Sequence, residues 1–211
     1  MAQMSKKMFK ADNLYVLPSK SGKLTKEILQ KWLKDVYFPS VPDVSVLILD
    51  SWSAQNEENI LYPKPENKEV VVKTIPAGTT PMVQPLDVFG FRIWKQFVRF
   101  FNDLVMLHDL TINIHLRNNL LKIQSIAHNQ LSSPRFYSMW KYSWYKCGYV
   151  DSKPDSFVNQ VEYCFKDGFS DDACDVCDDV LCIIARCAWC TKTFCIGHFF
   201  ETMHYCKQYN E

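Results

Sequence analysis

The sequence predicts an α/β fold followed by a small cysteine-rich module at the C-terminus. Two runs of β-branched and aliphatic residues, at 44–49 and 70–75, lie among segments with helical periodicity. Seven of the nine cysteines fall within residues 174–206, together with two histidines. Because 47% of the 211 residues are apolar and 14% are aromatic, the chain can bury a core, which predicts one domain plus a small module.

The first expected elements are a helix and a strand. Residues 24–38 place their apolar side chains on one helical face, with Thr25 as the N-cap and Pro39 as the stop. The aliphatic run at 44–49 suits a strand that is buried on both faces. Asp50 then lies at the carboxyl end of this strand.

A polar connection and a proline-rich loop surround the second expected strand. Residues 51–68 are polar and contain two prolines, so we expect a loop or at most a short helix there. A strand follows at 70–75. Residues 76–85 contain three prolines and a glycine, which predicts an irregular loop. This loop delivers Asp87 to the start of the next helix.

Three helices and a linker are expected in the remainder before the cysteine cluster. Helical spacing begins at Val88 and recurs over 111–130. A third helix is expected to start at Pro134, because proline is favoured in the first helical turn, and to reach Cys147. Residues 151–173 are acidic and predict an irregular linker.

The formal net charge of +1 hides a strong asymmetry. Residues 88–150 carry eight Lys/Arg against two Asp/Glu, and residues 151–211 carry five against eleven. Arg92, Lys95 and Arg99 share one helical face. A basic block of this kind can neutralise phosphates, so DNA is an expected partner of the helices in 88–150. A solvated helical surface is the alternative interpretation.

The start of the chain lacks the apolar stretch of a signal peptide, and the run at 44–49 is far too short to span a bilayer. We therefore expect no membrane partner and a nuclear or cytoplasmic location. In such a compartment, clustered cysteines indicate metal ligation rather than disulfide bonds.

The cysteine-rich segment offers eight candidate ligands in four close pairs. They are Cys174, Cys177, Cys187, Cys190, Cys195, His198, His204 and Cys206. Since a structural Zn²⁺ ion takes four sulfur or nitrogen donors, this number fits two closed structural sites. A single zinc with spare thiols is the alternative. Three further cysteines are interpreted as buried small hydrophobes: Cys147, Cys164 and Cys182.

The order of the ligand pairs is similar to that in cross-brace modules such as B-box and RING domains. That similarity implies that the first pair joins the third and the second joins the fourth. Site one would then be Cys174, Cys177, Cys195 and His198, and site two would be Cys187, Cys190, His204 and Cys206. Sequential pairing is the alternative. The acidic surface of the module favours contact with a protein partner or with the basic helices.

Asp50 and Asp87 are 37 positions apart, and each ends a strand-like or loop-like stretch. Two carboxylates at neighbouring element ends can hold Mg²⁺ or Mn²⁺ through hard oxygen ligands. Such ions catalyse in-line phosphoryl displacement, in which one activates the attacking oxygen and the other stabilises the leaving oxygen. An aspartate that ends a strand is, by itself, more often a cap or loop residue.

The string Thr79–Asp87, TTPMVQPLD, resembles the signature that precedes the last acidic residue of pogo-like DDE/DDD transposases. The resemblance covers roughly residues 10–150, and Asp50 matches the second acidic position. It implies an RNase H-like fold over residues 1–150, with DNA strand cleavage and transfer in intact members. Residues 151–173 then connect this domain to the zinc module at 174–211.

Residues 1–49 contain no match to the first acidic position of the family, and Gln55 replaces a histidine often found there. We therefore expect a transposase-derived endonuclease segment that is catalytically incomplete as this isolated chain. One alternative is a non-enzymatic DNA-binding or protein-interaction factor derived from a transposon. Another is a broken gene copy.

Overall fold

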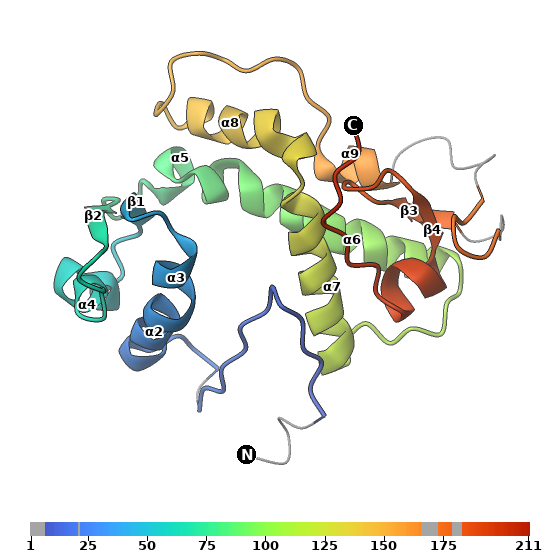
Figure 1. The fold of residues 1–211 in the computed structure, drawn as a ribbon, viewed down its shortest axis with the longest axis horizontal. Coiled ribbons are helices and arrows are strands. Elements are labelled where there is room, and N and C mark those ends of the chain that lie inside the picture. The colour runs from blue at the N-terminus through green and yellow to red at the C-terminus, as the bar shows by residue number, and fades with distance from the viewer. Residues whose placement is uncertain (1–6, 21, 166–172, 179–182) are drawn as a thin grey trace. The chain divides into compact units, whose positions relative to one another are not determined.

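The computed structural model describes residues 7–20, 22–165, 173–178 and 183–211 (Figure 1). The chain forms two compact units, one made of Tyr15–Val88 and the other of Met1–Leu14 together with Phe89–Glu211. Each unit has its own buried apolar cluster. The mixture of helices and strands fits the expected α/β class. Within the described ranges, no helix is both long enough and apolar enough to cross a membrane.

The helix expected at 24–38 is present in the Tyr15–Val88 unit. It begins as α2 (Lys26–Trp32), loosens into a π-helical turn, η1 (Leu33–Tyr37), and ends as α3 (Phe38–Ser40). Thr25 is the N-cap, and its hydroxyl accepts a hydrogen bond from the backbone N–H of Ile28 at 3.4 Å. The helix stops one residue after its proline, because Val41 adopts an extended conformation.

Two parallel strands follow this helix. They are β1 (Val44–Leu49) and β2 (Glu69–Thr74), which pair along their whole length. The connection between them contains a 3₁₀ turn, η2 (Ser53–Gln55), and a short helix, α4 (Glu57–Leu61), which confirms the prediction of a short helix at most. Asn56 caps α4 by accepting from the backbone N–H of Asn59 at 2.9 Å.

The prediction that the first strand is buried on both faces is wrong. The helices α2 and α4 contribute Leu29 and Ile60 to an apolar cluster with Val70 of β2, so one face of the pair is covered. On the other face Val44 is 69% exposed and Val46 is 60% exposed. The side chains of a strand alternate between its two faces, and within this unit the helices cover only one of them.

The loop expected at 76–85 contains one helical turn that the sequence analysis missed, α5 (Thr80–Val83). Its proline lies in the first turn, where a missing N–H breaks no helical hydrogen bond. Gly78 precedes this turn with φ +83°, a conformation that favours glycine. A π-helical turn, η3 (Leu86–Gly90), then leads into the next helix.

The second unit contains the three helices expected after Val88. They are α6 (Phe91–Leu107), α7 (Arg117–Leu131), and the pair η4 (Pro134–Phe136) and α8 (Tyr137–Lys146). The middle helix is shorter than expected, because residues 111–116 precede its first turn. The hydroxyl of Ser133 caps η4, which confirms the expected start at proline.

The prediction that residues 151–173 are irregular is wrong over α9 (Gln160–Phe165). The side chain of Phe165 is buried against α6, with its ring centroid 4.7 Å from that of Phe97 and 5.1 Å from that of Phe100. Cys164 is fully buried beside it, as expected, whereas Cys147 is only partly buried. Cys182 lies outside the described residues. A helix of this length gives too little periodicity to be recognised in an acidic segment.

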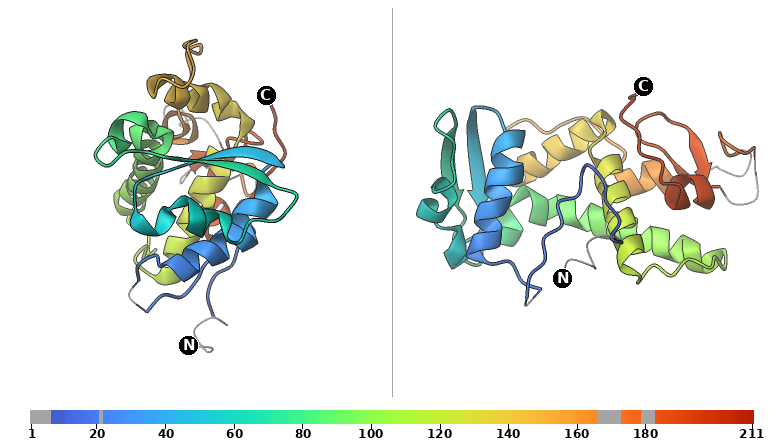
Figure 2. Two further views of the ribbon diagram at one scale, coloured as in Figure 1. Left: turned by 90° about the vertical axis from the view of Figure 1, so that its left-hand side faces the viewer. Right: turned by 60° about the horizontal axis from the view of Figure 1, so that its bottom comes forward.

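The cysteine-rich segment shares one hydrophobic core with the helices of its unit. It forms an antiparallel hairpin of β3 (Ile183–Arg186) and β4 (Thr193–Cys195), followed by a π-helical turn, η6 (Gly197–Glu201). The hairpin lies beside α9, as the right-hand view in Figure 2 shows, and η6 contacts α7. Phe200 packs on Phe101 of α6 with ring centroids 4.9 Å apart.

This packing predicts that Phe101→Ala destabilises the second unit strongly. The ring is 1% exposed, and its removal leaves a cavity where α6 meets η6, which costs about 3–5 kcal/mol. Phe91→Ala on the same helix is the matched control, because that ring is 43% exposed. Urea unfolding followed by fluorescence measures both, and equal losses of stability would contradict the shared core.

Candidate metal centre

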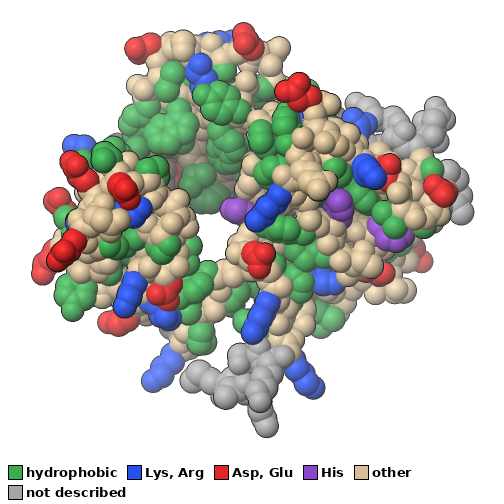
Figure 3. Space-filling model, in the orientation of Figure 1, with side chains coloured by type: hydrophobic (Ala, Val, Ile, Leu, Met, Phe, Trp, Pro, Cys, Tyr) green, Lys and Arg blue, Asp and Glu red, His purple; other side chains and the backbone are tan. Residues whose placement is uncertain are grey.

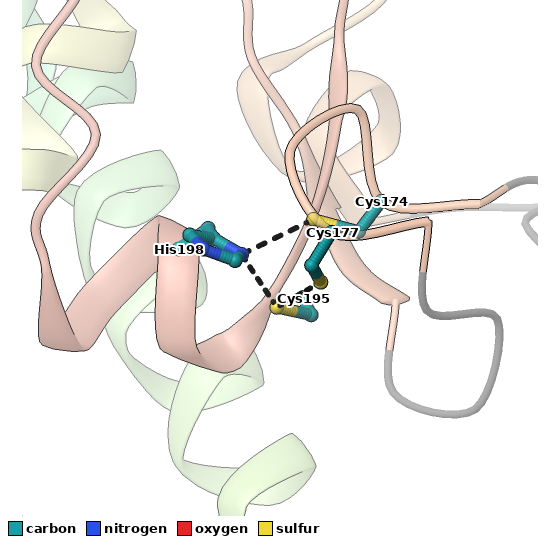
Figure 4. A group of neighbouring side chains, drawn as sticks. All are labelled: Cys174, Cys177, Cys195 and His198. Atoms are coloured by element: carbon teal, nitrogen blue, oxygen red, sulfur yellow. Dashed lines mark hydrogen bonds between the residues drawn. The ribbon is translucent and has the colours of Figure 1, made fainter.

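Four ligand-type side chains meet between the loop before β3, the end of β4 and η6 (Figure 4). They are Cys174, Cys177, Cys195 and His198, and their ligand atoms all lie within 4.8 Å of one another. The Nδ1 atom of His198 is 3.4 Å from the sulfur of Cys174 and 3.2 Å from that of Cys195. We call these four residues the first cluster.

A second cluster of the same composition lies in the β3–β4 turn and the C-terminal segment. Its members, also within 4.8 Å of one another, are Cys187, Cys190, His204 and Cys206. The sulfur of Cys190 is 3.5 Å from Nε2 of His204. Backbone N–H groups point at two of the sulfurs: Trp189 donates to Cys187, and Gln208 donates to Cys206, each at 3.4 Å.

These two clusters contain the same residues as the two sites that the cross-brace similarity implies. The first and third ligand pairs meet, and so do the second and fourth. Sequential pairing would instead gather the first and second pairs, and in the described residues the structure does not group them in this way. Metal binding by the clusters remains a prediction.

Side chains outside the ligand set hold the first cluster in place. The carboxylate of Asp175 accepts from the backbone N–H of Thr193 at 2.7 Å and from its hydroxyl at 3.3 Å. The same hydroxyl can also donate to the carbonyl of Ala173, 2.8 Å away. These contacts fix the ligand-bearing loop against β4, which itself carries a ligand.

The cysteines of the first cluster differ in their acidity. Burial alone raises the pKa of the Cys174 thiol, but backbone N–H groups and a neighbouring thiol that face its sulfur bring the pKa down to about 6. Burial raises the pKa of Cys195 to about 11, and the nearby sulfur of Cys174 adds to this increase. Thiolates this close together repel one another, and a bound cation would compensate their charge.

The imidazole of His204 is held in its neutral form. Burial lowers its pKa, and Lys192 lowers it further. The ring stacks on Phe194 with centroids 4.0 Å apart. Neutral imidazole is the form that ligates metals, so this environment suits the second cluster to an ion.

The donor set of each cluster is three thiols and one imidazole, with no carboxylate. Soft sulfur ligands suit zinc and similar metals, whereas Mg²⁺ and Ca²⁺ require oxygen ligands. Both clusters can therefore hold a metal ion, and four protein ligands match a structural rather than a catalytic coordination shell.

The two predicted acidic residues belong to the other unit. Asp50 directly follows β1 and is half-buried, with one carboxylate oxygen 3.3 Å from the backbone N–H of Trp52. Asp87 is exposed in the turn η3. The chain leading from β2 towards Asp87 begins beside Asp50, because the N–H of Ile75 donates to the carbonyl of Leu49 at 2.7 Å. Among the described residues, no group of three or more metal-ligating side chains includes either aspartate.

The basic residues expected to contact DNA lie along α6. Arg92, Lys95 and Arg99 are exposed along α6, as their spacing predicts. The face drawn in Figure 3 shows lysine and arginine side chains lying singly among other types. Arg99 forms a weak, exposed ion pair with Asp103 at 4.0 Å, and the guanidinium of Arg92 lies 5.3 Å from the ring centroid of Phe89. Neither contact buries these cations, so they can reach a phosphate backbone.

The sequence analysis did not identify two polar residues, in the last turn of α7 and just after it, that hydrogen-bond to the backbone at or next to ligands of the second cluster. Asn129 donates from its side-chain amide to the carbonyl of Cys206 at 2.9 Å, and the hydroxyl of Ser133 donates to the carbonyl of Ala188 at 2.7 Å. No local pattern marks these residues, since their partners are more than 50 positions away in the sequence.

Comparison with known protein families assigns both parts of the chain. The model of the DDE superfamily endonuclease matches residues 5–144, and that of the Tc5 transposase C-terminal domain matches residues 144–206. No curated protein and no solved structure matches the chain. The endonuclease model alone spans more than half of the sequence. The chain therefore belongs to the DDE superfamily endonucleases and derives from a pogo-like transposase.

Proposed function

We propose that this transposase-derived chain binds DNA and contributes two metal-binding carboxylates to strand cleavage and transfer. The proposed organisation is an RNase H-like domain with its C-terminal helices at 1–150, a connection at 151–173 and a two-zinc module at 174–211. The match to the endonuclease model over residues 5–144 is the observation that carries this proposal. DNA as a partner is consistent with a nuclear location.

The C-terminal module is proposed to bind two Zn²⁺ ions, one in each cluster. The gathering of eight sulfur and nitrogen donors into two groups supports this number. The ions would supply folding free energy and no catalytic water, because each shell is filled by protein ligands. Residues 174–211 carry three Lys/Arg against five Asp/Glu, so the module is proposed to contact a protein rather than phosphates.

Elemental analysis of the purified chain should find about two zinc ions per molecule, since a structural zinc takes four such ligands. Cys177→Ser should remove the ion of the first cluster, and Cys190→Ser should remove that of the second. Cys147→Ser is the matched control, because that cysteine belongs to neither cluster and should leave the zinc content unchanged. A folded, zinc-free chain would refute the two-zinc module.

The basic stripe of α6 is proposed to contact the DNA backbone. Replacing Arg92, Lys95 and Arg99 together by alanine should weaken binding to duplexes of any sequence, because phosphate contacts carry no sequence information. The slope of log K against log salt should become shallower by about 0.9 for each phosphate that the variant no longer neutralises. Fluorescence anisotropy over a salt series measures both effects.

Lys153→Ala is the matched control for this experiment. That lysine is also exposed, but it lies in the acidic connection rather than on the helix. An unchanged salt slope in the triple variant, or an equal loss of affinity in the control, would show that α6 does not face the DNA.

Asp50 and Asp87 are proposed to bind Mg²⁺ or Mn²⁺. Support comes from the pairing of β1 and β2, because the carboxyl ends of parallel strands meet at one edge of a sheet and the chain towards Asp87 leaves from that edge. The ion would supply charge stabilisation for phosphoryl displacement, and the two carboxylates would hold it in position.

A second candidate function is a DNA-binding factor that has lost catalysis. One observation favours it: in the part of the chain that the structure describes, no third metal-ligating side chain gathers with Asp50 or Asp87. With fewer carboxylates than the three of the family core, the chain alone is expected to cleave DNA weakly or not at all.

Asp50→Ala and Asp87→Ala separate the two functions. Both variants should bind DNA as tightly as the unmodified chain, and any Mg²⁺-dependent nicking of supercoiled plasmid should disappear. Asp43→Ala, at the opposite end of β1, is the matched control and should leave nicking unchanged. Nicking that persists in both aspartate variants would exclude these residues from the reaction, and an unmodified chain that binds DNA without nicking would favour the second function.

A further inference from the structure

Gln130 is a fully buried polar residue near the end of α7, and every part of its side-chain amide is engaged. Its oxygen accepts from the backbone N–H of Ala188 at 2.6 Å and faces the sulfur of Cys164 at 3.9 Å. Its nitrogen donates to the side-chain oxygen of Asn129 at 3.1 Å and to the sulfur of Cys187 at 3.5 Å.

The orientation of this amide follows from its partners. A backbone N–H can only donate, so the group that faces the N–H of Ala188 must be the oxygen of Gln130. The nitrogen of Gln130 therefore points at the sulfur of Cys187, a member of the second cluster. An N–H donor at that position holds the sulfur of Cys187 by a hydrogen bond from a helix outside the cysteine-rich segment.

We propose that Gln130 is a positioning residue of the second cluster, through which helix α7 holds the sulfur of Cys187 in place for a metal ion. This inference rests on the proposed function of the clusters as metal sites. The Gln130 amide holds two neighbouring residues. Its oxygen accepts from the backbone N–H of Ala188, and its nitrogen donates to the sulfur of Cys187. The second site thereby depends on a helix that lies 57 positions away in the sequence.

Removing the N–H donor of Gln130 should weaken metal binding by the second cluster for a reason that is separate from the loss of packing. The sulfur of Cys187 would keep its hydrogen bond from the N–H of Trp189 at 3.4 Å but would lose the second donor. With three sulfurs in the cluster, each donor withdraws negative charge that the ion must otherwise balance. Hydrogen-bonding partners of metal ligands typically change metal affinity by about 10- to 100-fold.

The effect should be confined to one cluster. In the part of the chain that the structure describes, no side chain of α6, α7, α8 or α9 donates a hydrogen bond to a ligand of the first cluster. The first cluster is held instead by contacts within its own segment, such as that between Asp175 and Thr193. The first cluster is therefore an internal control for the effect of Gln130 on the second cluster.

The test loads the full chain with ¹¹³Cd and compares Gln130→Met with Gln160→Met. Gln160 is the matched control, because it is also a fully buried glutamine but donates to the carbonyl of Ala127 at 2.9 Å and, among the described residues, forms no hydrogen bond to a cluster ligand. We expect two ¹¹³Cd resonances. In Gln130→Met only the resonance of the second cluster should shift, and a chelator should remove that ion about 10- to 100-fold faster than from the control.

If both variants bind two ions with the same resonances and the same release rates, Gln130 does not position the second cluster, although both metal sites exist. A chain that binds no cadmium would overturn the metal sites themselves. If Gln130→Met does not fold, the unmodified chain supplies the test. The side-chain amide protons of Gln130 should shift when Zn²⁺ is exchanged for Cd²⁺ while those of Gln160 stay unchanged, and an unshifted Gln130 amide would refute the contact.

Discussion

The second unit depends on the crowding of thiol and imidazole groups around two points in a segment that has few other means of folding. Three sulfurs and one imidazole within 4.8 Å cannot all take their ligand forms unless a cation balances them. The pKa of Cys174 is lowered to about 6 and that of Cys195 is raised to about 11, as expected for thiols that crowd one another. The same segment contacts side chains that α6 and α7 bury, because Phe200 packs on Phe101 and the sulfur of Cys187 faces the amide of Gln130.

The same constraint explains why the cysteine-rich segment is not an independent appendage. Its hairpin buries Phe194, and its π-helical turn buries Phe199 and Phe200, in the cluster that also contains the apolar faces of α6, α7 and α9. A segment of this size buries little apolar surface by itself and needs either a metal or a neighbour. This segment has such a neighbour, because its aromatic rings pack on helices, and its eight donors gather in two clusters that can hold a metal ion.

The Tyr15–Val88 unit is organised around a parallel strand pair rather than around a ligand cluster. Its sheet brings the end of β1 and the chain leaving β2 to one edge, which is where a parallel α/β arrangement places functional residues. Asp50 lies at that edge, and the proline-rich segment with α5 connects β2 to Asp87 in η3. The uncovered valines of β1 show that the helices of this unit close only one face.

Local pattern in the sequence determined the α/β class, the cap at Thr25, the strands β1 and β2 and the three main helices, and it singled out the eight cysteines and histidines that the structure gathers, because each rests on residues close together in the chain. Local pattern failed to predict the features that depend on contact with residues far away in the sequence. The helix α9 forms because Phe165 is buried on α6, and Val46 is exposed because helices cover only the opposite face of its strand. The contact between Gln130 and Cys187 joins residues 57 positions apart, with no signal in either neighbourhood. Only the tertiary structure decides such features, because burial and long-range hydrogen bonds are properties of packed elements and not of the local chain.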